Sequence, residues 1–215
     1  MIAMTNRKAA NREIEEATAT ALKERGYTRI RGIFLKPLAE GVKGWVGLLR
    51  ARQRTKNGEI QITPNIGVRH ERIHELINRL KPPKEPNPVP TATTHIGYLM
   101  PEKTANICWL FGQEPPPDEV ARGLADYIVR YGEPWMQERV PQEAIIEQLR
   151  FNQRGSRPWY PERLPVALLL AGCPDEARAA LDVELDKVDG AADPAAEAFR
   201  QFAKRFEAEV LTAED

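Results

Sequence analysis

The residue types most suited to catalysis lie together at positions 70 to 74, where the sequence reads His-Glu-Arg-Ile-His. This run matches the pattern His-Glu-x-x-His, in which two histidines one helical turn apart bind zinc and the glutamate activates a zinc-bound water. The sequence therefore offers His70 and His74 as metal ligands and Glu71 as the general base of a zinc-dependent hydrolase.

Other features of the same region favour a structural role for these histidines. Charged Arg72 and Glu75 stand where zinc peptidases usually carry uncharged residues, and the candidates for a third ligand, Glu85 and His95, lie at no recognised spacing. The apolar stripe between positions 73 and 80 centres about 90° from the bisector of the two histidines, which places them beside the core-facing side of a helix. We therefore expect no bound metal or other cofactor, and the hydrolase is the alternative hypothesis.

A second candidate site is the run of alternating arginines Arg50, Arg52 and Arg54 in a predicted strand. Successive strand residues point to opposite faces, so the three guanidinium groups share one face at a spacing of about 7 Å. Guanidinium groups bind carboxylates and phosphates through paired hydrogen bonds. We expect these arginines on the open, polar face of the sheet, where they would bind an acidic partner.

The kind of partner follows from what accompanies the arginines. Trp45 is predicted on the opposite face of the strand, and no aromatic residues alternate with the basic ones as they do in RNA-binding strands. We therefore expect the partner to be another protein, and a nucleic-acid-binding module is a further alternative.

Charge is distributed unevenly along a chain whose net charge is zero. Residues 1–81 carry 17 lysines and arginines against 8 acidic residues, and the remainder carries 14 against 23. Such asymmetry indicates either an anionic partner for the first part or docking of the two parts on each other. No apolar run approaches the roughly 18 residues of a membrane span, so we expect a cytoplasmic protein.

Hydrophobic periodicity predicts an α+β fold with a mainly antiparallel sheet of about five strands and helices on one face. Helices are expected at 5–25 and 69–80, and strands at 29–36, 44–54, 59–68, 93–100 and 104–111. A C-terminal all-helical bundle follows, with a helix through Val120 and Tyr131 and further helices at 141–151, 161–171, 174–189 and 194–211. We expect domains at 1–115 and 116–215, the second packed against the first.

Two resemblances accompany these patterns. The runs at 31–37, 44–48, 64–70 and 96–102 together resemble an uncharacterised family of bacterial α+β proteins over about residues 20–135. This resemblance implies a sheet with helices on one side and assigns no activity. The run at 168–181 is similar to the helix junction of a tetratricopeptide repeat, although no second copy occurs at a 34-residue period.

Together the sequence favours a non-enzymatic bacterial protein that binds another macromolecule, as an accessory or immunity-type factor in conflict systems. The zinc-dependent hydrolase and the nucleic-acid-binding module are the two alternatives. A partner, a substrate and an oligomeric state are left open.

Overall fold

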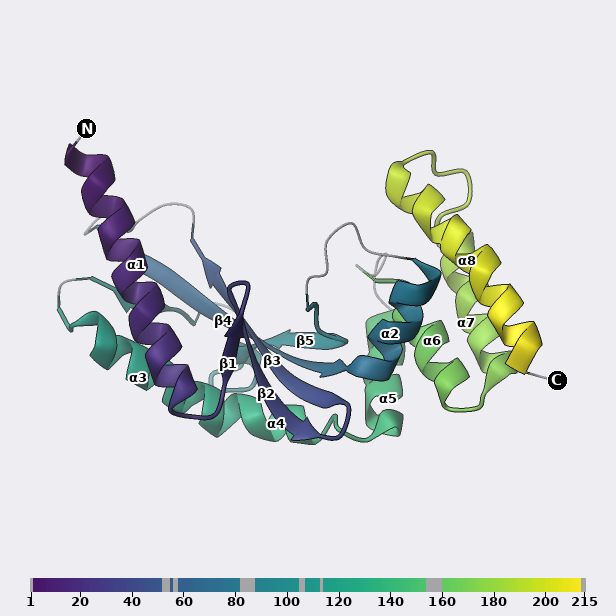
Figure 1. The fold of residues 1–215 in the computed structure, drawn as a ribbon, viewed down its shortest axis with the longest axis horizontal. Coiled ribbons are helices and arrows are strands. Elements are labelled where there is room, and N and C mark those ends of the chain that lie inside the picture. The colour runs from purple at the N-terminus through teal and green to yellow at the C-terminus, as the bar shows by residue number, and fades with distance from the viewer. Residues whose placement is uncertain are drawn as a thin grey trace. The chain divides into compact units, whose positions relative to one another are not determined.

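The chain divides into two compact units, each containing two segments of the sequence (Figure 1). The structure, a computed structural model, describes residues 2–51, 55, 58–81, 88–104, 107–112, 114–153 and 160–213. Met1–Val68 and Thr93–Glu138 form what we call the sheet unit, and Arg69–Ala92 and Arg139–Asp215 form the helical unit. The domains expected at 1–115 and 116–215 stay a prediction, and so does the packing of the second against the first.

The strands form one six-stranded sheet, and the predicted α+β class with an antiparallel sheet and C-terminal helices is confirmed. Their bounds are β1 (Thr28–Ile30), β2 (Ile33–Ala39), β3 (Val42–Arg50), β4 (Ile60–His70), β5 (Ala92–His95) and β6 (Trp109–Phe111). The order is β1-β2-β3-β4-β5, and β6 pairs antiparallel with the beginning of β4.

Several of the predicted strands are shorter or divided in the structure: the strand expected at 44–54 ends at Arg50, and the one expected at 104–111 is observed at Trp109–Phe111. The single strand expected at 29–36 is wrong, because a two-residue turn at Arg31 and Gly32 makes it a hairpin of β1 and β2. Both turn residues have positive φ, 49° and 83°, as the tight type I′ turn requires. The strand expected at 93–100 ends at His95 and continues as the 3₁₀ helix η1 (Ile96–Tyr98).

Helices cover one face of the sheet within the sheet unit (Figure 1). They are α1 (Ile2–Lys23), α3 (Pro117–Tyr127), the π-helical turn η2 (Ile128–Gly132) and α4 (Glu133–Gln137). The covered face is apolar, with Phe34, Val46 and Ile62 at most 3% exposed. Gly44 allows α4 to approach, since a Cβ there would stand 2.6 Å from the sulfur of Met136.

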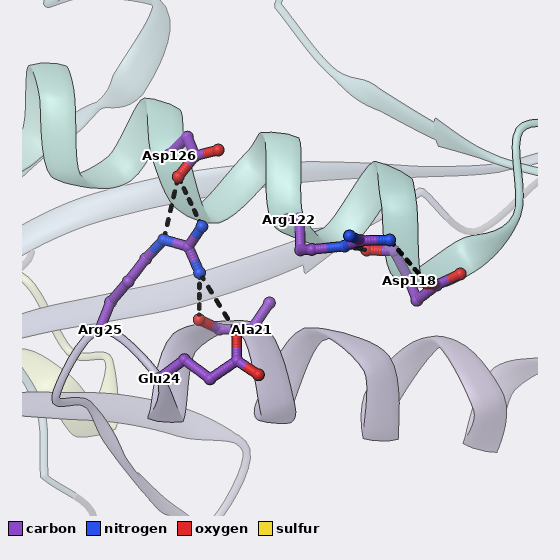
Figure 2. A network of polar contacts seen from close by, with 6 residues as sticks. All are labelled: Ala21, Glu24, Arg25, Asp118, Arg122 and Asp126. Carbon is purple, nitrogen blue, oxygen red and sulfur yellow. Dashed lines mark hydrogen bonds and ion pairs between the residues drawn. The ribbon is translucent and has the colours of Figure 1, made fainter.

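The C-terminal end of α1 is joined to α3 by Arg25, as Figure 2 shows. Its Nε and Nη2 donate to Asp126 at 3.1 and 2.5 Å, and its Nη1 donates to the carbonyl oxygen of Ala21 at 2.7 Å. Arg122 and Asp118 form a separate, exposed ion pair along α3 at 2.8 Å. All three nitrogens of the Arg25 side chain therefore donate hydrogen bonds that link the end of α1 to α3.

The helical unit contains α2 (Glu71–Leu80), α5 (Gln142–Gln153), α6 (Arg163–Leu170), α7 (Pro174–Lys187) and α8 (Pro194–Ala213). Pro174 and Pro194 begin their helices, because proline's fixed φ suits the first helical position. The pair α6 and α7 turns at Gly172, whose φ is 76°, and the buried Ala177 lets the helices approach closely. A helix pair near 161–189 is therefore confirmed.

Packing inside the helical unit depends on the aromatic face of α8. Phe199, Phe202 and Phe206 are each at most 1% exposed, and neighbouring rings lie 5.9 and 5.7 Å apart. The helical spacing of these three rings is visible in the sequence, which explains why this element was predicted well.

Candidate functional site

The His-Glu-x-x-His run does not lie on one helix. Strand β4 continues through Arg69 and His70, and α2 begins only at Glu71. His70 is the N-cap residue of α2 with an extended backbone, φ −94° and ψ 110°. The prediction of a helix at 69–80, with both histidines one helical turn apart, is therefore wrong at its first two residues. Strand β4 extends through these residues, further than the hydrophobic periodicity indicated.

Both histidines are buried, and both are hydrogen-bonded to other parts of the protein. Thr91, which is fully buried, accepts the backbone N–H of His70 at 2.9 Å, and its hydroxyl is hydrogen-bonded to Nε2 of His74 at 3.1 Å. Nε2 of His70 lies 2.9 Å from the carbonyl oxygen of Arg139. A carbonyl oxygen only accepts, so this nitrogen carries the proton and has no lone pair for a metal.

The electrostatics of this cluster keep the imidazoles neutral. The pKa of His74 is lowered to about 2, mainly by burial and also by the nearby charges of Arg69 and Arg163. Burial also lowers the pKa of His70, although its hydrogen bond to Arg139 opposes that shift. A cationic imidazole would be poorly solvated here, so both rings act as neutral hydrogen-bonding groups at neutral pH.

The remaining residues of the proposed zinc site also have other partners. Glu71 pairs with Arg69 at 2.9 Å, and Nδ1 of His95 accepts the N–H of Gly97 at 3.3 Å. Glu85 lies outside the described residues. No three histidine, cysteine, aspartate or glutamate side chains are grouped to hold a metal ion in the part of the chain that the structure describes.

Arg163 completes this buried cluster, and sequence reasoning missed it. Its Nη1 donates to the carbonyl oxygen of Thr91 at 2.9 Å, and the ring centroid of Tyr160 lies 3.5 Å from its Cζ. Burial lowers the pKa of Arg163 to about 10, so it is charged at neutral pH. A single arginine at a helix start has no distinctive pattern that could have revealed this contact.

The predicted arginine run is described at Arg50 only, because Arg52 and Arg54 lie outside the described residues. Nη2 of Arg50 lies 3.3 Å from one carboxylate oxygen of Glu15, and Nη2 of Arg29 lies 3.1 Å from the other. One carboxylate on α1 thus bridges guanidinium groups from β3 and β1. The three side chains are 45%, 41% and 32% exposed for Glu15, Arg29 and Arg50.

These three charged residues also line a mostly apolar pocket between α1 and the sheet. The pocket has a volume of about 250 Å³. Its lining residues are Ile14, Glu15, Thr18, Arg29, Gly32, Phe34, Leu48, Arg50 and Ile62. We call this pocket and its three charged residues the Arg29–Arg50 site.

Arg50 was expected on the open face of the sheet, and that expectation is wrong. It lines the pocket together with Leu48 and Ile62, so it lies on the face that α1 covers. Trp45 lies on the opposite face, as predicted, with its ring over Gly47. The buried side chains of β3 decide the face, because residues of one strand alternate and Val46 belongs to the core.

Local structure explains how the site is positioned. The type I′ turn directs β1 back along β2, so that Arg29 pairs directly with Phe34 and shares its face. Glu15 follows the buried Ile14 along α1 and lines the same pocket. Neither Glu15 nor Arg29 was predicted, because their pairing joins residues 14 positions apart in sequence and depends on the helix docking.

Comparison with known proteins identifies no relative, since no family model, curated protein or solved structure matches this chain. The resemblances to a bacterial α+β family and to a tetratricopeptide repeat gain no support from it. No helix among the described residues is long and apolar enough to cross a membrane. The function is therefore inferred from the chain's own side chains, and no family is assigned.

Proposed function

We propose that this chain is a non-enzymatic binding protein that recognises an acidic segment of another protein at the Arg29–Arg50 site. The observation that carries the proposal is the charge in the lining of the pocket, where two partly exposed guanidinium groups contact the single carboxylate of Glu15. These three groups have one positive charge in excess, and all are partly exposed. A carboxylate of the partner would supply the second anion.

The two guanidinium groups retain hydrogen-bonding capacity. Each arginine has five N–H donors, and a single nitrogen of Arg29 and of Arg50 contacts Glu15. Arg25, by contrast, directs all three of its nitrogens to protein acceptors. Arg25 is therefore a structural arginine, whereas Arg29 and Arg50 have donors left for a ligand.

The surroundings of the charges favour a protein over a nucleic acid. Sites for single-stranded nucleic acid combine basic residues with exposed aromatic rings on which bases stack. The aromatic residue in the lining of this pocket is Phe34, which is 3% exposed and offers no stacking face. An apolar depression with a charged rim is the usual arrangement of a protein-binding surface.

A peptide-display selection tests this proposal. Random peptides would be selected on the full chain and then compared on the double variant Arg29→Glu/Arg50→Glu. The matched control is Arg122→Glu/Arg130→Glu, which changes net charge equally at two exposed positions outside the pocket. Circular dichroism and thermal melting would establish that each variant is folded.

We expect selected peptides to be rich in aspartate and glutamate, and to lose at least about tenfold in affinity on the site variant. The control should change affinity by less than about twofold. Selection of peptides without acidic residues, or equal binding by both variants, would refute the proposal. Binding of a single-stranded oligonucleotide with a steep salt dependence would instead support the nucleic-acid alternative.

A further inference from the structure

Apart from its three charged residues, the Arg29–Arg50 pocket is lined mostly by apolar side chains. Ile14, Phe34 and Ile62 form buried parts of the lining, and Leu48 adds a half-buried side chain. The hydroxyl of Thr18 donates to the carbonyl oxygen of Ile14 at 2.8 Å, so it is satisfied within its own helix. A group that enters the pocket therefore meets hydrocarbon and gains by leaving water.

The volume of the pocket is small for a cofactor and sufficient for one aliphatic side chain. Sites for drug-sized ligands and cofactors measure about 300 to 1,000 Å³. At about 250 Å³ this pocket falls below that range. Two of its walls are strands whose residues Phe34 and Ile62 are at most 3% exposed, so the walls are held by the core and the pocket is already formed.

Glu15 indicates where an acidic group of a ligand would bind. Its carboxylate bridges Arg29 and Arg50, and all three residues line the pocket. In an extended peptide neighbouring residues are about 3.3 Å apart along the chain. A carboxylate one or two residues from a buried side chain would therefore reach the same pair of guanidinium groups.

We infer that the pocket receives one aliphatic side chain of the acidic segment, of the size of leucine, isoleucine or methionine, beside an aspartate or glutamate. This inference rests on the proposed function and specifies its ligand. The arginines select the acidic residue, and the pocket selects the aliphatic one. Full burial of such a side chain should increase the affinity for the peptide by about 10- to 100-fold.

Two peptides of equal charge test the inference. The first has leucine between aspartate and glutamate at its centre, and the second has alanine in place of that leucine. Binding to the full chain would be followed by fluorescence anisotropy. The variant Leu48→Trp adds bulk to the lining without changing charge, and Leu48→Ala enlarges the same pocket as the complementary change.

We expect the parent protein to bind the leucine peptide at least about tenfold more tightly than the alanine peptide. Leu48→Trp should abolish this preference, while Leu48→Ala should shift the preference toward a third peptide of the same charge that has phenylalanine in place of the leucine. If Leu48→Trp fails to fold, the result with Leu48→Ala decides.

Failure of the inference differs from failure of the proposed function. Equal binding of the leucine and alanine peptides, with both interactions lost in Arg29→Glu/Arg50→Glu, would overturn the pocket's role and leave recognition of acidic segments intact. Binding of neither peptide, together with display selections that yield no acidic sequences, would overturn both. A leucine preference that persists in Leu48→Trp and in Leu48→Ala would place the apolar contact elsewhere and also sink the inference.

Discussion

Each of the two units contains a cluster of polar residues, which is buried in the helical unit and partly exposed in the sheet unit. In the helical unit, His70, His74 and Arg163 surround Thr91 and are each less than 9% exposed. In the sheet unit, Arg29 and Arg50 share the carboxylate of Glu15 at a surface and keep unused donors. The first cluster is buried and bonded within the protein, and the second is partly exposed.

A sequence pattern typical of catalysis is therefore not sufficient to locate a functional site. The histidines matched a known metal-binding spacing, yet their Nε2 atoms are hydrogen-bonded to Thr91 and to a carbonyl oxygen. The arginine at the end of β3 matched no specific motif, yet it lines a pocket. Exposure distinguishes the two clusters: Nη2 of Arg163 also has no hydrogen-bond partner but is buried, whereas the spare donors of Arg29 and Arg50 are on partly exposed side chains.

The largest effect should come from Thr91→Val, which keeps the shape of a buried residue and removes its hydroxyl. The N–H of His70 and the ring of His74 would lose their partner, at a cost of about 2 to 4 kcal/mol in the free energy of unfolding. The matched control is Thr18→Val, because that equally buried hydroxyl bonds only within α1. Urea denaturation measures both, and equal destabilisation would contradict the central role of Thr91.

Acid should destabilise the protein through the same cluster. The pKa of His74 is about 2 when folded and about 6.5 when unfolded, so the unfolded chain binds the extra proton as pH falls. The contribution of His74 is complete above pH 6.5 and is lost progressively below it. Between pH 7 and pH 4.5 the loss is about 2 to 3 kcal/mol.

The titration of His74 is isolated by comparison with His74→Gln, which is polar but does not titrate. The difference in free energy of unfolding between the two proteins should shrink as pH falls from 7 to 4.5, because only the parent loses this contribution. Chemical denaturation at a series of pH values provides the measurement. A difference that is constant with pH would show that His74 titrates normally.

A smaller effect is expected from Arg25→Ala in the sheet unit. Its side chain is 20% exposed and joins α1 to α3 through Asp126 and the carbonyl oxygen of Ala21 (Figure 2), so we expect a loss of about 1 kcal/mol. Arg122→Ala removes an exposed pair with Asp118 and should cost less than about 0.5 kcal/mol. Thermal melts of the two variants measure the contrast, which would disappear if Arg25 were equally dispensable.

The smallest change in stability should accompany Glu15→Gln, because exposed ion pairs contribute at most about 1 kcal/mol. Its effect on binding should be larger than its effect on folding. Removing the internal carboxylate frees both guanidinium groups, so an acidic peptide should bind several-fold more tightly. Weaker binding would mean that Glu15 orders the arginines for the ligand and does not compete with it.

The sequence by itself determined the elements whose apolar residues repeat regularly. The aromatic spacing of α8, the prolines that begin α7 and α8, and the alternating isoleucines of β4 each predicted an element of the fold. These signals are local, because a helix or a half-buried strand must present one apolar face whatever it packs against. The α+β class follows from their order along the chain.

Only the tertiary structure decided what the polar residues do. His70 lies at the junction of β4 and α2 because strand pairing continues through Arg69, and Thr91, 21 positions away, accepts its N–H. Glu15 meets Arg50 across 35 positions because α1 docks on the covered face of the sheet. Contacts of this kind have no sequence period, so they arise only when the apolar faces have packed and fixed which polar groups are buried, paired or open.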